Sequence, residues 1–449
     1  MTAAQHAPPC PVDEFPWLSS VPSGWVVIRL KQTVADIKNG VWGDEPNGLD
    51  DLACVRVADF DRTTNRVDQA EPTLRAISRS QRKGRLLHRG DLLLEKSGGG
   101  EQQPVGCVVL FDLNMPEAVC SNFVAKITLA NGFEPRFLAY EHAFLYAVEV
   151  NRRSIKQTTG IQNLDSDSYL NERIAVPPLE AQTAIADFLD RKTQAIDELI
   201  RKKERLIELL QEKRQALITQ AVTKGLDPNV QMKDSGVPWL GKIPAHWSIV
   251  RTSYVASVFN GSTPARNVPD YWVDEGIPWL SSGKVNEDPI LEPSAWISRT
   301  ALRDCSLRLA PKGSVAVGMV GQGRTRGMTT RLGIDATINQ NMAAIVPSAS
   351  LDAEFLSYVF QAAYQDLRLL GRGANQAALN CEILKAYRIP LPALAEQRRI
   401  AELVVSALDR TARVQHPLLA QIARLQEYRQ ALISAAVTGQ IDVSEEVAA

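Results

Sequence analysis

The sequence predicts an α+β protein built from two copies of a globular domain, each followed by a long helix. Three observations lead to this fold class. Short motifs recur across nearly the whole chain of 449 residues, a length that favours two or three domains. A long segment without Gly or Pro follows the first domain, and a matching segment with one Pro closes the second half. Inside each half, short apolar runs typical of buried strands alternate with helical segments.

The duplication is visible in pairs of motifs that keep their order along the chain. Three such pairs are Pro16-Trp17-Leu18 with Pro238-Trp239-Leu240, Phe137-Leu138-Ala139-Tyr140 with Phe355-Leu356-Ser357-Tyr358, and Arg214-Gln215-Ala216-Leu217-Ile218 with Arg429-Gln430-Ala431-Leu432-Ile433. The last pair shares its sequence offset with the pair Gln182 and Gln397, so no insertion separates these two matches. In the front part of each copy, the difference in residue number between matching motifs varies along the chain, as expected when loops differ in length. Each copy is therefore predicted to be a variable globular domain followed by a segment of fixed length.

The globular domains are predicted to mix strands with helices. Strands are expected at 91–94, 105–110 and 314–317, and helices at 140–150 and 355–370. The predicted boundaries are a first domain at 1–177, a central helix at 178–225, a linker at 226–235, a second domain at 236–391, a C-terminal helix at 392–440 and a tail at 441–449.

The first long helix is predicted from Gln182 to Thr223. Its apolar residues recur three and four apart, charged residues lie between them, and Gly225 is a plausible stop. About 40 helical residues correspond to a rod of roughly 60 Å. The second copy runs from Gln397 to Thr438 but contains Pro417, which predicts a kink or a break at His416. Two such amphipathic helices are expected to pack on each other, although an ordinary surface helix is the simpler alternative.

Composition narrows the possible classes of protein. Lys+Arg number 50 and Asp+Glu 51, which excludes a generally polycationic nucleic-acid binder and requires any DNA contact to come from local basic surfaces. Residues 1–11 lack the pattern of a signal peptide, and no apolar run is long enough to cross a membrane. The six cysteines are scattered, so we expect reduced thiols and a cytoplasmic protein.

The sequence offers no convincing active site. It contains no P-loop, no metal-ligand spacing among its five histidines, and no methyltransferase tetrad. Gly98-Gly99-Gly100 and the Gly321/Gly323 pair favour turns over nucleotide sites. Glu95 and Lys96 are adjacent and would point to opposite faces of a strand, unlike a metal nuclease centre. We therefore predict no catalytic residue, no metal and no cofactor.

Two stretches are locally cationic, between Pro72 and Gly90 and between Cys305 and Ile334, at matching places in the two copies. This repetition favours phosphate contacts over a merely solvated face. Arg and Gln side chains recognise guanine and adenine edges, and glycines let a loop approach a groove closely. Another pair of candidate loops is 157–163 and 372–376, for which a structural turn is an equal alternative. The DNA-binding candidates are Arg79, Arg82, Lys83, Arg85, Lys96, Gln162, Asn163, Lys284, Gln322, Arg324, Arg326, Arg372, Asn375 and Gln376.

Three further stretches carry a family resemblance. Residues 222–247, including Gly225-Leu226-Asp227-Pro228 and Gly236-Val237-Pro238-Trp239-Leu240-Gly241, closely resemble the linker of type I restriction–modification specificity subunits. So do the Pro-rich starts of both helices, Pro177-Pro178-Leu179-Glu180 and Pro392 with Glu396-Gln397. The resemblance covers essentially the full chain. The second helix start is one residue longer than the first, and Pro417 also departs from the family pattern.

The resemblance implies two target-recognition domains separated by two antiparallel coiled-coil helices. Each domain would recognise one half of a bipartite, asymmetric sequence in double-stranded DNA. The helices would set the spacing and dock two modification (methyltransferase) subunits, which bind S-adenosylmethionine, while restriction/translocase subunits would supply ATP-driven cleavage. The docking candidates are Gln182, Ile185, Arg214, Gln397, Ile400 and Arg429. The alternatives are a self-contained DNA methyltransferase or nuclease, and a coiled-coil assembly scaffold.

Overall fold

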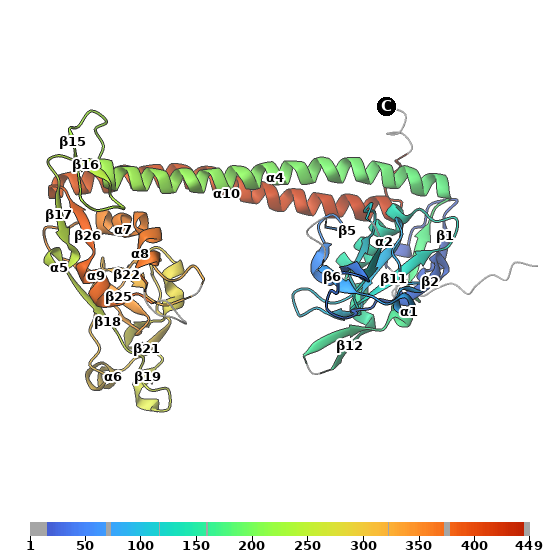
Figure 1. Ribbon diagram of the computed structural model, residues 1–449, viewed down its shortest axis with the longest axis horizontal. Helices are drawn as coiled ribbons and strands as arrows, with labels where there is room; N and C mark the ends of the chain where they lie inside the picture. The colour runs from blue at the N-terminus through green and yellow to red at the C-terminus, as the bar shows by residue number, and fades with distance from the viewer. Residues whose placement is uncertain are drawn as a thin grey trace, which may run out of the picture. The chain divides into compact units, whose positions relative to one another are not determined.

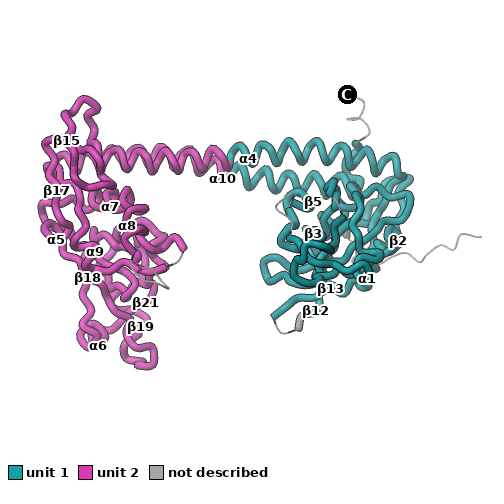
Figure 2. The backbone as a smooth tube through the Cα atoms, viewed as in Figure 1, with its two compact units in different colours: residues 1–203, 420–449 teal, residues 204–419 magenta. Residues whose placement is uncertain are grey.

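The computed structural model describes residues 16–68, 73–115, 117–158, 160–321, 323–371 and 378–443. The chain divides into two compact units, residues 1–203 with 420–449 and residues 204–419 (Figure 2). Unit 1 and unit 2 each hold one globular domain and a part of both long helices, α4 (Leu179–Lys224) and α10 (Leu394–Val437) (Figure 1). The predicted α+β duplication with two long helices is therefore confirmed.

Four sheets form the domain of unit 1 within the described residues. The largest has the order β2 (Val34–Asn39), β11 (Val124–Leu129), β7 (Leu92–Glu95), β9 (Val108–Leu110), β5 (Arg66–Val67) and β4 (Phe60–Asp61). The others are β10 (Ala118–Cys120), β3 (Asp51–Val55) and β6 (Thr73–Ala76); β12 (Ile155–Thr158), β13 (Ile161–Leu164) and β8 (Ser97–Gly98); and β1 (Val26–Arg29) with β14 (Arg173–Val176). The helices are α1 (Arg79–Arg82), α2 (Pro135–Ala147) and α3 (Ser166–Tyr169).

Unit 2 also contains four sheets in the part of the chain that is described. Two have four strands, β18 (Ala256–Asn260), β25 (Met342–Pro347), β22 (Val315–Gly318) and β23 (Thr329–Arg331), and β19 (Trp272–Val273), β21 (Ala295–Ile297), β20 (Ile277–Leu280) and β24 (Thr337–Ile338). The two-stranded sheets are β17 (Ser248–Arg251) with β26 (Arg388–Leu391), and β15 (Met232–Asp234) with β16 (Lys242–Pro244). The helices are α5 (Thr252–Val255), α6 (Arg299–Asp304), α7 (Ala353–Ala362), α8 (Tyr364–Leu370) and α9 (Cys381–Ala386).

The two domains repeat the same pattern of strand pairing. In unit 1, β11 pairs antiparallel with β2 and β7, and β7 pairs antiparallel with β9. In unit 2, β25 pairs antiparallel with β18 and β22, and β22 with β23. A second sheet in each unit has a central strand, β3 or β20, with one parallel and one antiparallel neighbour. The sequence repeat thus corresponds to a repeat of topology.

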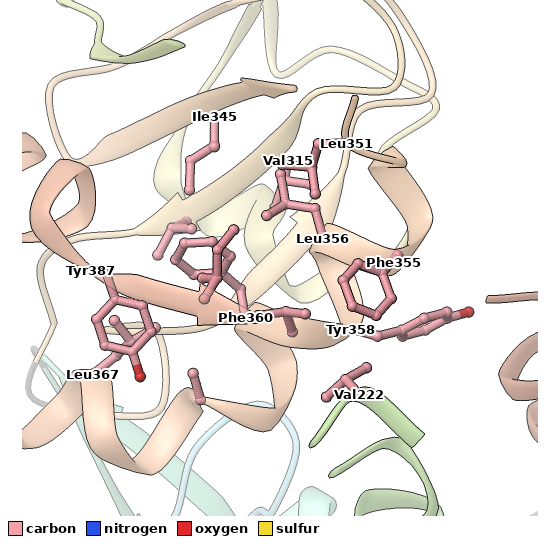
Figure 3. Packing of buried hydrophobic residues seen from close by; sticks show 14 of the residues in the cluster. Val222, Val315, Ile345, Leu351, Phe355, Leu356, Tyr358, Phe360, Leu367 and Tyr387 are labelled. Carbon is pink, nitrogen blue, oxygen red and sulfur yellow. The ribbon is translucent and has the colours of Figure 1, made fainter. Parts of the chain in front are cut away.

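Both long helices contribute to the hydrophobic core of each unit. In unit 1, Ile185 of α4 and Ile433 of α10 are buried with Phe137 of α2. In unit 2, Val222 of α4 and Ile400 of α10 join the cluster that contains Phe355 of α7; Figure 3 shows Val222 and Phe355 within it. Burying a side chain of this size stabilises the fold by roughly 1.5–3 kcal/mol. The helices are therefore parts of the domain cores as well as connections.

The two helices run antiparallel where they meet in unit 1. Arg429 Nε donates to Asp197 Oδ1 at 2.9 Å, and Lys203 Nζ donates to Gln421 Oε1 at 2.6 Å. Residue numbers rise along α4 as they fall along α10. The antiparallel arrangement implied by the family resemblance is thus present.

Glycines in the left-handed region follow both helices. Gly225 has a φ of +73° and its N–H donates to Ala221 O at 3.1 Å, as expected for the predicted stop. Gly439, which the sequence analysis did not single out, has a φ of +71°. There Gln440 N–H reaches Ala435 O at 2.8 Å, which satisfies one of the last carbonyls of α10.

The predicted break at His416 is wrong, because α10 continues through Pro417. Proline costs a helix interior about 3 kcal/mol through its missing N–H and the clash with the carbonyl of Arg413. Buried side chains on both sides, including Val404 and Ile422, anchor the helix within the two units. Pro417 and Arg413 are both exposed, so water can donate a hydrogen bond to the carbonyl of Arg413, which lacks its usual helical donor.

Other differences from the expected elements are local. The expected linker between the copies contains β15, which pairs with β16. The expected helix at 355–370 is divided at Ala363 into α7 and α8, and the expected strand at 105–110 begins only at Val108. The loop expected at 157–163 instead belongs to the hairpin of β12 and β13.

Candidate nucleic-acid interface

The first basic stretch combines structural and exposed cations. Arg75 is buried, lies 4.6 Å from the centre of the Trp42 ring and pairs with Glu45. Arg82 Nη2 donates to Asp50 Oδ1 at 2.9 Å, and Arg82 Nη1 to Glu117 Oε2 at 3.1 Å. Arg82 and Arg75 therefore stabilise the fold as well as adding positive charge.

The remaining cations of this stretch differ in exposure. Arg85 is half-buried and donates to Asn39 O at 3.0 Å and to Gln81 O at 3.0 Å. Arg79, Lys83 and Arg89 are exposed. Ser78 caps α1, which carries Arg79, by accepting a hydrogen bond from Gln81 N. Exposed cations on a capped turn suit contact with phosphates.

Lys96 and the hairpin candidates of unit 1 have partners within the domain. Lys96 Nζ donates to Asn39 Oδ1 at 2.7 Å, whereas the neighbouring Glu95 is buried. Gln162 is buried and its Oε1 accepts from Val105 N at 3.1 Å; Asn163 Oδ1 accepts from Ser97 Oγ at 2.6 Å. Gln162 and Asn163 thus form hydrogen bonds with the glycine-rich segment 97–107, which agrees with the structural alternative that the sequence left open for this stretch.

The second basic stretch includes a tight loop between β22 and β23. Gly327 N–H donates to Gly318 O at 2.8 Å, and Gly318 N–H to Met328 O at 2.9 Å. Gly321 and Gly327 have φ values of +139° and +82°, which side chains with a Cβ rarely adopt. Within the loop Arg324 is exposed and Arg326 half-buried. The glycines thus fold the loop into a shape that exposes Arg324.

Other cations of unit 2 lie beside acids or aromatic rings. Lys284 Nζ contacts both carboxylate oxygens of Glu287, at 2.8 and 3.0 Å. Arg331 pairs with Glu354, and the exposed Arg308 lies 4.0 Å from the centre of the Phe259 ring. Four candidates, Gln322, Arg372, Asn375 and Gln376, lie outside the described residues.

Most of the predicted docking residues are buried. Gln182, Ile185, Gln397, Ile400 and Arg429 are all less than 9% exposed, whereas Arg214 is exposed. Gln182 Oε1 accepts from Glu134 N at 2.9 Å, where α2 begins, and Gln397 Oε1 accepts from Asp352 N at 2.8 Å, where α7 begins. Their recurrence reflects the attachment of each helix to its domain. Of the six, Arg214 alone is exposed in the structure, and docking through these residues stays a prediction.

The described part of the chain shows neither a group of side chains placed to hold a metal ion nor a helix that could cross a membrane. No group of three or more His, Cys, Asp or Glu side chains is arranged to hold a metal ion among those residues. None of the helices described is long and apolar enough to cross a membrane.

Sequence reasoning missed Tyr146 and Tyr364, whose hydroxyls contact the glycine-rich segments of unit 1 and unit 2. Tyr146 Oη donates to Pro104 O at 2.7 Å, and Tyr364 Oη to Arg324 O at 2.9 Å. They follow the repeated Phe137 and Phe355 at the same distance, which is the pattern that could have identified them.

Comparison with known proteins identifies relatives of both halves of the chain. The family model described as type I restriction modification DNA specificity domain matches residues 80–209 and 244–424. The type I restriction enzyme MjaIX specificity subunit of Methanocaldococcus jannaschii is 29% identical over 175 residues, 38% of this chain and 39% of the relative. The MjaVIII specificity subunit of that organism is 24% identical over 299 residues, 65% of this chain and 67% of the relative.

One solved structure has a similar fold over nearly the whole chain. It comes from work on complex assembly and conformational transition of the type I R-M system. The TM-score is 0.71 at 18% sequence identity, with 94% of this chain and 100% of the other covered. The chain spans about two fifths of the length of the MjaIX relative.

Proposed function

Because this chain belongs to the type I restriction modification DNA specificity family, we propose that its two units recognise the two halves of one bipartite DNA target. The target is asymmetric and double-stranded, and a nonspecific gap separates its halves. The chain itself carries out no chemistry. It selects the site at which its partners act.

The observation that carries this proposal is one scaffold with two different loops. The strand pattern of β11, β7 and β9 recurs in β25, β22 and β23. The connecting segments differ: 98–104 contains Glu101-Gln102-Gln103, whereas 321–327 contains Arg324 and Arg326. Equivalent positions with different hydrogen-bonding groups suit two different half-sequences.

Electrostatics supports localised contact with DNA. The formal net charge of the chain is −1, so long-range attraction by the whole protein is weak. Exposed cations such as Arg79, Lys83 and Arg324 supply positive charge at the surface of the two units. We assign Arg79 and Lys83 to phosphates, which position the protein, and Arg324 with Arg326 to base edges, which specify sequence.

We further propose that the outer faces of the two long helices dock two modification subunits. In unit 2, Leu206 and Leu209 of α4 and Leu403 and Leu419 of α10 are 42–56% exposed, so both helices offer apolar surface to a partner. The docked subunits methylate adenine with S-adenosylmethionine. Restriction/translocase subunits then join for ATP-dependent cleavage.

Exchange of the second domain tests the recognition proposal. Residues 236–391 are replaced by the equivalent domain of a relative, and the variant is expressed with its modification subunits. Sequencing-based mapping of methylated adenines should show one changed half-sequence and one unchanged half. Simultaneous changes in both halves would contradict independent recognition by the two units.

Purified wild-type chain, incubated without partners, should transfer no methyl group from S-adenosylmethionine to target DNA.

A further inference from the structure

A tyrosine holds the glycine-rich segment in each unit. Tyr146, near the end of α2, donates its hydroxyl to Pro104 O at 2.7 Å, in the segment between β7 and β9. Tyr364, the first residue of α8, donates to Arg324 O at 2.9 Å, in the segment between β22 and β23. The two tyrosines occupy equivalent places in the repeat, yet they bind carbonyls of segments that differ in sequence.

An arginine completes the contact in unit 2. Arg368 Nη1 donates to Gly323 O at 2.7 Å and lies 3.2 Å from both Arg326 O and Tyr364 Oη. Its guanidinium also lies 5.5 Å from the centre of the Tyr364 ring. One side chain therefore holds two carbonyls of the loop, and Tyr364 holds a third between them. All three contacts are made by the one nitrogen Nη1, whose two hydrogens are shared among the three acceptors.

Unit 1 has an arginine at its tyrosine too, although it comes from another part of the chain. Arg62 Nη1 donates to Tyr146 Oη at 3.1 Å, and Arg62 Nη2 donates to Glu95 Oε2 at 2.8 Å. Glu95 is the last residue of β7 and is fully buried. Burial raises the pKa of Tyr146 to about 12, so its hydroxyl keeps the proton that Pro104 O accepts.

The loop of unit 2 shows why such contacts matter. Two of its glycines have positive φ values, and glycine loses more conformational freedom on folding than any other residue. A loop of this composition samples many shapes unless its carbonyls are held. An arginine that recognises a base must hold its guanidinium in position for two hydrogen bonds, and a mobile backbone would not keep it there. Fixing the carbonyls of Gly323, Arg324 and Arg326 fixes the directions in which both arginines leave the backbone.

We propose that Tyr364 with Arg368, and Tyr146 with Arg62, are positioning residues that set the shape of each recognition loop and thereby its sequence preference. This inference rests on the proposed function. The residues touch the loop backbone and not the DNA. Their removal should therefore loosen the choice between bases without removing a phosphate contact.

The test uses Tyr364→Phe and Tyr146→Phe, each assembled with the modification subunits. Methyl transfer is measured on the wild-type target and on duplexes with single-base changes in either half, and discrimination is the ratio of kcat/KM values. Tyr364→Phe should lower discrimination about tenfold in the half assigned to unit 2, since one hydrogen bond contributes on this scale. Tyr146→Phe should do so only in the other half. The salt dependence of DNA binding should not change, because the phenol carries no charge.

The matched control is Tyr254→Phe, at a tyrosine that is 74% exposed, and it should leave discrimination in both halves unchanged. Arg368→Met, which keeps most of the side-chain length but removes every donor, should reproduce the half-specific effect if Tyr364→Phe lowers the unfolding midpoint. Unchanged discrimination in the folded variants would overturn the inference, and so would equal losses in both halves from one substitution. A wild-type complex with no bipartite preference would contradict the proposed function instead, before any variant is made.

Discussion

At the scale of single residues, the repeated glutamines show how one side chain joins a helix to a domain. Gln397 is fully buried; its Oε1 accepts from Asp352 N, and its Nε2 donates to Pro392 O at 2.9 Å and to Ser350 O at 3.1 Å. Gln182 repeats all three contacts, with Glu134 N, Pro177 O and, at 3.5 Å, Gly132 O. An amide is suited to this position because it is both a donor and an acceptor.

Gln397→Ala should therefore destabilise unit 2. Buried backbone groups would lose their partners, at a cost of roughly 1–3 kcal/mol. Urea unfolding followed by circular dichroism measures the change. Gln220→Ala, at an exposed site on α4, is the control and should stay within about 0.5 kcal/mol of the wild type. An equal effect of both substitutions would show that the buried contacts contribute nothing particular.

A buried histidine predicts acid sensitivity of unit 1. His142 Nδ1 lies 2.8 Å from Tyr169 Oη, and burial lowers the pKa of His142 to about 4. The unfolded chain takes up a proton near pH 6.5 and the folded chain does not, so stability falls as pH drops from 6.5 towards 4. The expected loss is about 3 kcal/mol.

Urea unfolding of the wild type and of His142→Asn across this pH range checks the expected loss. Between pH 6.5 and pH 4 the wild type should lose about 3 kcal/mol of stability relative to the variant. The adjacent Glu141 is present in both proteins, and burial raises the pKa of its carboxyl, which makes its own contribution opposite in sign. The difference between the two profiles isolates His142. Parallel profiles would contradict a buried neutral imidazole.

At the scale of elements, the long helices are amphipathic by sequence but anchored by tertiary packing. Their apolar periodicity predicted α4 and α10 in type and nearly in length. At Pro417, where the sequence predicts a kink or a break, the helix does not break, because helix propensity is local whereas the anchoring contacts come from residues distant along the chain. The prediction of one continuous helix at 355–370 is wrong in the opposite sense, because the helix is interrupted at Ala363 although no proline is present.

Pro417→Ala should stabilise α10. The substitution restores the N–H donor to Arg413 O and removes the ring clash, a gain of up to about 3 kcal/mol. Lys202 occupies the equivalent place in α4 and is exposed. Lys202→Pro is the matched reverse change and should destabilise by a similar amount. Thermal unfolding of both variants measures the pair, and a lower midpoint for Pro417→Ala would contradict this explanation.

At the scale of the whole molecule, the structural units cut across the sequence repeats. The end of α4 packs in unit 2, where a Cβ at Gly225 would lie 3.2 Å from Trp247 Cζ2. The end of α10 packs in unit 1, where a Cβ at Gly439 would lie 3.2 Å from Trp25 Cζ2. Each domain is thus completed by a segment of both helices. The domain boundaries at 177 and 391, placed where the helices begin, remain a prediction.

If the helices set the gap of the DNA target, lengthening both should lengthen the gap. Four residues inserted after Lys203 and four after Leu419 extend each helix by about 6 Å and one turn, which preserves the antiparallel pairing. The half-sequences should stay the same while the gap grows by at most about two base pairs at roughly 3.4 Å each. Mapping of methylated adenines decides this. An active enzyme with an unchanged gap would show that the helices dock partners without measuring DNA.

The sequence alone determined what depends on local pattern: the duplication, the α+β class, the two long helices and the glycine stop at Gly225. Periodicity and turn chemistry are properties of neighbouring residues, so they are present in the chain before it folds. The same holds for the two basic stretches that contain Arg79, Lys83 and Arg324, although only the structure shows that these three are exposed.

Only the tertiary structure decided which polar residues serve the fold. Arg82 is paired with Asp50, and Gln162 supports Val105, because acids and backbone groups far away in sequence come close only after folding. A buried polar group has lost its contact with water and therefore needs a hydrogen-bond partner in the protein. These partners are too distant in sequence to be recognised from neighbouring residues. The return of α10 to the first domain is of the same kind, since the burial of Ile433 beside Phe137 depends on where the chain ends up in space.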